Sequence, residues 1–392
     1  MLVFGIMAPN SSIEPTQLMT TITGPLAIFA SFSGAGGVER MLVNLIRGFV
    51  DQGQAVELVL ARAESPHLTR LPESVRRVRL ATRHTQLAAP ALARYLRERR
   101  PVALLAAKDR AGRTAVLARA LAGTDTPIAL RLGTNLSTAM ARRAAPSRWL
   151  RYYPIRLLYP YIDNILAVSE GVADDTAQIA RVPRANITVI RNPVITPELA
   201  VQAAEDCPHP WLNDAGPNPR VPVICAAGRL ERQKDFPTLI RAFARVLPHR
   251  DCRLLILGEG KARPGLLALI AELGLGDRVA LAGFQANPYS FMARSALFVL
   301  SSAWEGSPNV LTEALALGTP VVATDCPSGP AEVLDGGRFG PLVPVGDVAA
   351  LSAAMVATLE RPLPAALLRS AVSEYEQGRS ARHYLKAMGL AI

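Results

Sequence analysis

The sequence predicts an α/β protein of two domains, each built on a doubly wound parallel sheet. Three observations carry this prediction. Short apolar runs alternate with longer amphipathic segments in the first half of the chain, the same alternation returns in the second half, and prolines cluster between the halves. The length of 392 residues fits two domains of about 100–200 residues each.

The apolar runs of the first half are expected to be buried strands, because short aliphatic runs between helical segments are typical of parallel sheets. They lie at 25–32, 55–61, 102–107, 127–132 and 164–168. Amphipathic segments at 38–51 and 111–122 fit helices, and Gly53 ends the first of them.

The second half repeats this pattern. Strands are expected at 221–227, 253–257, 278–282, 297–301 and 320–324, and helices between them at 237–247, 264–273 and 309–317. The predicted organisation is an N-terminal extension at 1–23, a first domain at 24–195, a proline-rich linker at 196–220, a second domain at 221–372 and a final helix at 373–392. Ligands of open parallel sheets bind at the carboxyl ends of the strands, so we expect a site in the cleft between the domains.

Charge is spread unevenly along the chain. The formal net charge is +11, and residues 1–195 hold 25 Lys and Arg against 13 Asp and Glu, whereas residues 196–392 hold 18 against 19. A basic first half fits an anionic membrane surface or another polyanion as partner, and equally an Arg-rich solvated face. The basic residues are dispersed and no nucleic-acid-binding module is recognisable, so nucleic acid is not an expected partner.

The composition favours a reducing, cytoplasmic location. The four cysteines have no CxxC spacing and form no recognisable disulfide framework, and with five scattered histidines they predict no metal site. No Lys or Arg precedes Arg40, which argues against a secretory signal, and no apolar run reaches 18 residues.

A glycine-rich turn, Ser-Gly-Ala-Gly-Gly-Val at 33–38, follows the first predicted strand and opens a helix. Gly36 and Gly37 would let the backbone approach a ligand closely, and free amides at a helix start favour an anion. The turn lacks the third glycine of a dinucleotide-binding fingerprint and the Lys-Ser/Thr of a P-loop, so an ordinary tight turn is an equal alternative.

A second polar loop, Gly-Arg-Leu-Glu-Arg-Gln-Lys-Asp at 228–235, follows the strand at 221–227. Arg229 and Lys234 can both reach a point above the end of that strand. A guanidinium fork and an ammonium group together suit a diphosphate. Taken alone, the loop is more typical of a solvated charged turn.

The third motif is the most specific. Residues 301–318 place Glu305 on a loop, Ser307 and Pro308 at an expected helix N-cap and first turn, and Glu313 on a mostly apolar helix. A carboxylate on such a helix is costly to bury without partners. Amides at the helix start between two carboxylates suit a diphosphate flanked by hydroxylated rings. The alternative is a helix-dipole interaction, which explains Glu305 better than Glu313.

Together these motifs resemble the signature set of the glycogen-synthase-like retaining glycosyltransferases, family GT4, which have the GT-B fold. The later segments 320–325, 328–334 and 341–347 also resemble the C-terminal block of that family. The resemblance spans about 25–390 and is strongest over 221–350. It implies two Rossmann-like domains that face each other across a cleft, with the last helix crossing back to the first domain.

The resemblance also implies roles for individual residues. Arg229 and Lys234 would bind the donor diphosphate and stabilise the leaving group, Glu305 would contact the transferred sugar, and Glu313 would hold the ribose hydroxyls. The remaining implied donor-binding positions are Gly36, Gly37, Phe284, Gly306, Asn309 and Val310. The donor is then a nucleoside diphosphate sugar, with a UDP-sugar the expected one, and neither a metal nor another cofactor is required.

One departure from the family concerns the first domain. Many members carry a histidine near the sugar, at the strand end that matches 106–110, and none of the five histidines falls there. Lys108, Asp109, Arg131 and Asn135 are the candidates to contribute instead on the acceptor side. This departure affects sugar positioning and acceptor choice more than donor binding.

The expected acceptor is a glycan or a lipid-linked sugar. Residues 142–159 mix Arg, Trp and Tyr at helical spacing. This pattern fits a helix on the inner face of an anionic membrane, and slightly better a surface helix that packs through Trp149 and the tyrosines. The alternative functions are a nucleotide-sugar epimerase and a non-catalytic nucleotide-sugar-binding protein. An epimerase would convert donor without any acceptor.

Overall fold

The computed structural model describes residues 24–34, 36–80, 82, 84–140, 145–213 and 221–390. The predicted extension at 1–23, residues 214–220 of the predicted linker and all the basic side chains of 142–151 lie outside the described residues.

The first domain contains a seven-stranded sheet in the order β3-β2-β1-β4-β5-β6-β7, and every pair of neighbours is parallel. Its strands are β1 Leu26–Phe32, β2 Val56–Ala63, β3 Arg76–Arg79, β4 Ala103–Ala106, β5 Ile128–Leu132, β6 Asn164–Ala167 and β7 Ile187–Val189. Its helices are α1 Gly37–Asp51, α2 Ala89–Arg99, α3 Asp109–Ala122, α4 Leu136–Met140, α5 Ala145–Leu158 and α6 Glu170–Ala180.

The second domain contains a six-stranded parallel sheet in the order β10-β9-β8-β11-β12-β13. Its strands are β8 Val223–Ala227, β9 Arg253–Leu257, β10 Val279–Gly283, β11 Leu297–Leu300, β12 Val321–Thr324 and β13 Leu342–Val343. The remaining helices are α7 Pro197–Ala204, α8 Phe236–Val246, α9 Arg263–Glu272, α10 Tyr289–Arg294, α11 Asn309–Leu317, α12 Pro330–Val333, α13 Val348–Glu360, α14 Ala365–Ser370 and α15 Gln377–Ala387. Two doubly wound parallel-sheet domains are what the sequence predicts.

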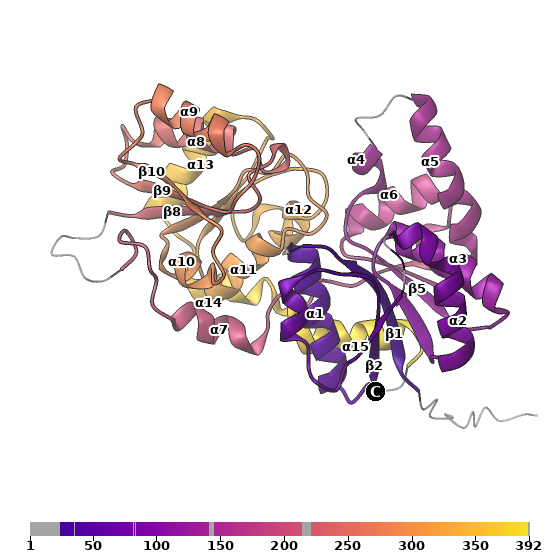
Figure 1. Ribbon diagram of the computed structural model, residues 1–392. Coiled ribbons are helices and arrows are strands. Elements are labelled where there is room, and N and C mark those ends of the chain that lie inside the picture. The colour runs from indigo at the N-terminus through magenta and orange to yellow at the C-terminus, as the bar shows by residue number, and fades with distance from the viewer. Residues whose placement is uncertain are drawn as a thin grey trace, which may run out of the picture.

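Both faces of each sheet are covered by helices (Figure 1). In β1, Ala27 and Phe29 pack into one apolar cluster with α2 and α3, while Leu26 and Ile28 pack into another with α1. Burial on both faces explains why this strand is a continuous apolar run without polar alternation.

Helix α15 follows the second domain in sequence but packs in the first (Figure 1). Tyr384 is fully buried and meets the ring of Phe49 on α1 edge to face, with 6.3 Å between ring centroids. A Cβ on Gly48 would lie 2.8 Å from the Cβ of Ala381, so α1 and α15 approach too closely for a larger residue there. The helix begins at Gln377, after a separate turn at Ser373–Tyr375, and not at 373 as predicted.

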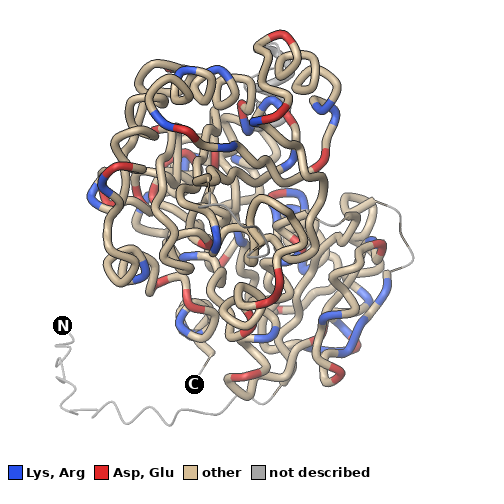
Figure 2. The backbone as a smooth tube through the Cα atoms, turned by 90° about the vertical axis from the view of Figure 1, so that its left-hand side faces the viewer, with Lys and Arg blue, Asp and Glu red and all other residues tan. Residues whose placement is uncertain are grey.

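The chain crosses between the domains twice, and the two crossings lie together. The amide of Val194 donates to the carbonyl of Tyr375 at 2.9 Å, and that of Gln377 donates to the carbonyl of Ile195 at 2.9 Å. Helix α7 forms within the predicted linker, and its Gln202 carbonyl accepts from the Asn287 side chain at 2.7 Å. Basic and acidic positions are interspersed over the side that Figure 2 shows.

Candidate active site

The boundary between the domains is formed by helices that follow the carboxyl ends of strands. Helix α1 follows β1 through the glycine-rich turn, and α11 follows β11 through the loop at 301–308. Figure 1 shows α1 beside α11 and α12. The predicted motifs of the two domains therefore meet at the expected edges of the sheets.

Glu305 is the centre of the first polar cluster. The residue is 7% exposed, and its Oε1 accepts from Nζ of Lys234 at 2.6 Å and from Oγ of Ser302 at 2.7 Å. Lys234 packs over Gly228, where an added Cβ would lie 2.8 Å from the lysine Cε. A cation and a carboxylate from two separate sequence motifs thus form a nearly buried pair.

Glu313 joins the two domains. It is 2% exposed and forms an ion pair with Arg40 of α1, whose guanidinium lies over the Tyr289 ring, 5.6 Å from its centroid. The Tyr289 hydroxyl donates to the same oxygen, Oε1, at 3.4 Å. Burial raises the pKa of the Glu313 carboxyl, and the charge of Arg40 opposes that rise. Its second oxygen, Oε2, is buried with no hydrogen-bond partner in the described part of the chain.

Gly306 lies directly against the first domain. A Cβ added to it would be 2.2 Å from the carbonyl oxygen of Gly133, which rules out any side chain at this position without a shift of the backbone. The loop after β11 and the loop after β5 therefore touch through bare backbone.

Asn192 connects both domains through its side chain. Its Oδ1 accepts from the Arg131 guanidinium at 2.7 Å, and its Nδ2 donates to Oδ1 of Asn309, the first residue of α11, at 2.8 Å. Arg131 is buried, and that burial lowers the pKa of its guanidinium. Arg131 therefore orients the Asn192 side chain, which in turn contacts the second domain through Asn309.

Helix α12 adds a second set of contacts across the boundary. The Glu332 carboxylate accepts from the first two amides of α6, at 2.8 and 3.0 Å, and pairs with Arg191 at 2.5 Å. Nearby, the Ser328 hydroxyl donates to Oδ1 of Asn135 at 2.9 Å. A carboxylate of one domain thus caps a helix of the other.

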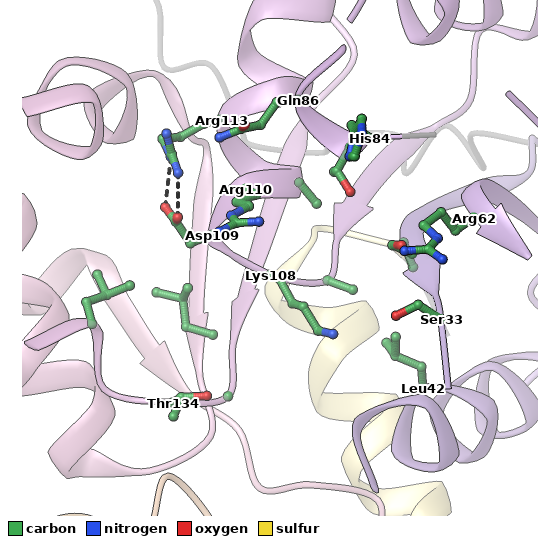
Figure 3. A pocket seen from close by; sticks show the side chains of 18 of the residues that line it. Ser33, Leu42, Arg62, His84, Gln86, Lys108, Asp109, Arg110, Arg113 and Thr134 are labelled. Carbon is green, nitrogen blue, oxygen red and sulfur yellow. Dashed lines mark hydrogen bonds and ion pairs between the residues drawn. The ribbon is translucent and has the colours of Figure 1, made fainter. Parts of the chain in front are cut away.

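A cavity of about 910 Å³ opens beside this boundary in the first domain (Figure 3). Lys108, Asp109 and Asn135, three of the four predicted acceptor-side residues, line it. Asp109 accepts two hydrogen bonds from Arg113, at 3.0 and 2.7 Å. The fourth, Arg131, is instead engaged with Asn192.

Two predicted donor-site residues are exposed to solvent. The Arg229 side chain is 73% exposed and lies 3.7 Å from the Glu231 carboxylate, and Phe284, just after β10, is 63% exposed. Arg229 and Lys234 therefore point to different partners in this structure, whereas the sequence predicted that both reach one point.

The N-termini of α1 and α11 are arranged mostly as predicted. Gly36 is the N-cap of α1 and Gly37 its exposed first residue, and Val310 is the second residue of α11. The prediction that Ser307 caps α11 is wrong: Pro308 holds the N-cap position and makes no side-chain cap. The Ser307 hydroxyl is buried and has no partner among the residues that the structure describes.

Sequence reasoning missed Arg40, Tyr289, Asn192 and Glu332. Each is a single polar or aromatic residue outside the motifs, or inside one without a predicted role. The one available signal was Glu313 itself, because a carboxylate buried on an apolar helix requires a cation from elsewhere.

No group of three or more His, Cys, Asp or Glu among the described residues is arranged to hold a metal ion. No helix among them combines the length and the hydropathy needed to cross a bilayer.

Two family models match the chain, one in each domain. Residues 35–197 match the model described as Glycosyltransferase Family 4, and residues 221–361 match the one described as Glycosyl transferases group 1. Together they cover both doubly wound domains.

Curated relatives include bacterial glycosyltransferases. The chain is 39% identical over 191 residues to the N-acetylgalactosamine-N,N'-diacetylbacillosaminyl-diphospho-undecaprenol 4-alpha-N-acetylgalactosaminyltransferase of Campylobacter jejuni, covering 49% of each protein. It is 36% identical over 196 residues to the lipopolysaccharide core biosynthesis glycosyltransferase LpsE of Rhizobium meliloti, covering 50% of this chain and 54% of that protein. The matched segments thus span about half the length of these relatives.

Solved structures with the same fold match almost the whole chain. The lipopolysaccharide outer core galactosyltransferase WaaB superposes with a TM-score of 0.72 at 20% identity, covering 94% of this chain and 99% of that one. HepE from Anabaena, solved in complex with UDP, also gives 0.72 at 20% identity, covering 94% of this chain and all of that one. With two matched domain models and two facing parallel-sheet domains, this chain is a GT4-like glycosyltransferase of the GT-B fold.

Proposed function

We propose that this chain is a retaining enzyme that transfers a sugar from a UDP-sugar to a glycan or lipid-linked acceptor, in the synthesis of cell-surface polysaccharide or glycolipid. One observation carries the proposal: two buried carboxylates, Glu305 paired with Lys234 and Glu313 paired with Arg40, lie on the loop and helix that follow β11. HepE, which shares the fold, has been solved with UDP and with UDP-glucose.

In this proposal the donor lies along the start of α11. Lys234 and Arg229 neutralise the diphosphate, and the amides near Asn309, Val310, Gly36 and Gly37 donate to its oxygens. The unpartnered Oε2 of Glu313 is an acceptor for the ribose hydroxyls, since a buried acceptor without a donor is unfavourable.

The remaining proposed roles concern the two ends of the donor. Glu305, with the backbone of Gly306, contacts the hydroxyls of the transferred sugar. Phe284 lies beside the base, where its exposed ring is available for contact.

The chemistry follows from where charge develops. Breaking the bond between the sugar and the diphosphate leaves negative charge on the diphosphate, which Lys234, Arg229 and the start of α11 stabilise. The acceptor hydroxyl attacks from the same face, and a phosphate oxygen takes its proton. Lys234 and Arg229 supply the positive charge that a divalent metal provides in metal-dependent enzymes, so we propose that the reaction needs no metal.

Saturation-transfer NMR tests the proposal by measuring the binding of a panel of nucleotide sugars in the presence of EDTA. We expect one UDP-sugar to bind selectively with EDTA present, and its conversion to require an acceptor. Conversion of the donor without an acceptor would favour an epimerase. Binding without any conversion would favour a non-catalytic nucleotide-sugar-binding protein. Binding that EDTA abolishes would contradict metal independence.

We further propose that the enzyme acts at the inner face of an anionic membrane, with α5 as its contact. Tyr153 and Leu157 on this helix are each 54% exposed, and Tyr161 just after it is 61% exposed. Exposed aromatic and aliphatic side chains beside basic residues are typical of interfacial helices. Flotation with anionic liposomes should show binding that weakens with salt, and the same recovery with neutral liposomes would contradict it.

A further inference from the structure

We propose that the cavity in the first domain binds a phosphoryl group of the acceptor, through Arg62, Lys108 and Arg110. This inference rests on the proposed transferase function. It names a chemical class for the acceptor, which neither the family nor the fold specifies.

The cavity is positioned as a substrate site. Its walls come from the carboxyl ends of β1, β2, β4 and β5, where open parallel sheets bind their ligands. Its volume of about 910 Å³ falls within the range of small-molecule sites, about 300–1,000 Å³. Gly133, whose carbonyl touches Gly306, is also part of its wall, so a molecule in the cavity lies next to the loop of Glu305.

The lining is strongly basic. Arg62, Lys108, Arg110 and Arg113 line the cavity together with a single carboxylate, Asp109. That carboxylate is already neutralised, because it accepts both hydrogen bonds from Arg113 and a third from the Tyr159 hydroxyl at 3.1 Å. No carboxylate in the cavity wall therefore remains to neutralise the positive charges of Arg62, Lys108 and Arg110.

These three cations are available to a ligand. Among the described residues, neither Lys108 nor Arg110 has a carboxylate within ion-pairing distance, and Arg62 pairs at 2.6 Å with the exposed Glu64. An exposed pair of that kind contributes little to stability, so a bound anion can replace it. Figure 3 shows Lys108 and Arg62 on opposite walls, with both side chains directed into the space between them.

The position of Lys108 and Arg110 is unfavourable without an anion. Lys108 is the N-cap of α3 and Arg110 lies in its first turn, where the helix dipole favours negative charge and disfavours cations. The same end of the helix presents free amides to the cavity. The two cations and the amides at the start of α3 therefore favour an anion bound beside that end of the helix.

A phosphoryl group fits this arrangement better than a carboxylate. A carboxylate offers two oxygens and is satisfied by one guanidinium fork, whereas a phosphate or diphosphate offers more oxygens and more charge to cations on opposite walls. The donor diphosphate already has Lys234 and α11 on the other side of the boundary. The group in this cavity therefore belongs to the acceptor, either as a lipid-linked diphosphate or as a phosphate on a glycan.

Calorimetric titration of the full chain, with and without saturating UDP, tests the inference. The probes are farnesyl diphosphate, as a lipid diphosphate, and a hexose 6-phosphate, as a phosphorylated sugar. We expect at least one probe to bind when UDP is present, and Arg110→Gln and the double variant Arg62→Gln/Arg110→Gln to weaken it by about tenfold or more. Arg94→Gln, an exposed arginine on α2 away from the cavity, is the matched control and should bind as the unaltered chain does.

The outcomes separate this inference from the proposed function. Binding of only one probe supports the inference and assigns the source of the phosphoryl group. Probe binding that depends on Arg110 while UDP fails to bind supports the anion site and contradicts the donor. UDP binding with no probe binding, or with probe affinity equal in the Arg110→Gln and Arg94→Gln variants, overturns the inference and leaves the donor site standing.

Discussion

Replacing Lys234 with alanine is expected to lower kcat by about 10²–10³-fold, with a much smaller change in donor KM. The ammonium group is nearly buried and pairs with Glu305 at 2.6 Å, so its charge is held in place before the diphosphate becomes more negative. Loss of such a preorganised cation costs the transition state about 3–4 kcal/mol. Steady-state kinetics with varied donor at saturating acceptor measures this split.

The control for this change is Lys386→Ala, which removes an exposed lysine from α15 and should leave both constants unchanged. Thermal unfolding of both variants shows whether the fold is intact, since among the described residues the Glu305 carboxylate keeps only Ser302 as a hydrogen-bond partner once Lys234 is gone. A kcat within threefold of the unaltered enzyme would contradict the role of Lys234.

Replacing Glu313 with glutamine is expected to raise donor KM by about 10–100-fold and to change kcat little, which corresponds to the loss of a charge-assisted hydrogen bond. The buried Oε2 would no longer be a charged acceptor for the ribose hydroxyls, and Arg40 would lose its ion-pair partner. Because the ribose does not change charge during the reaction, this loss affects ground state and transition state alike.

Two further variants sharpen the Glu313 test. Glu374→Gln changes an exposed carboxylate that pairs with Arg379 and should have no effect. Arg40→Gln should also raise donor KM, because it leaves Glu313 buried without its cation. Unchanged KM in both Glu313→Gln and Arg40→Gln would contradict the assignment of this pair to donor binding.

The sequence predicted the buried strands well and the sheet edges poorly. All ten predicted strands are present to within about two residues, because a strand covered on both faces must be apolar along its length. The three strands that were missed, β3, β7 and β13, lie at sheet edges. β3 reads Arg-Arg-Val-Arg and β13 has only two residues, so neither contains a buried apolar run that could be recognised.

The predicted site shows a similar division. Contacts within one motif or between neighbouring loops, such as Lys234 with Glu305, follow from the order of strands in a parallel sheet. Contacts across the boundary, such as Arg40 with Glu313, depend on how two separately folded domains dock, and no local pattern records that. The basic cavity was only partly foreseen for a different reason: Lys108 was a candidate, but Arg62 lies 46 positions away on another strand of the same domain.

The packing of α15 has a consequence for the order in which the protein is made. Tyr384 and its neighbours complete the apolar core of the first domain, yet roughly 180 residues separate them from the end of that domain at Val189–Ile195. At about 5–20 residues per second, the ribosome needs roughly 10–40 s to make that stretch. During this interval α1 presents an uncovered apolar face that includes Phe49, so the first domain is most exposed to aggregation while the second is being synthesised.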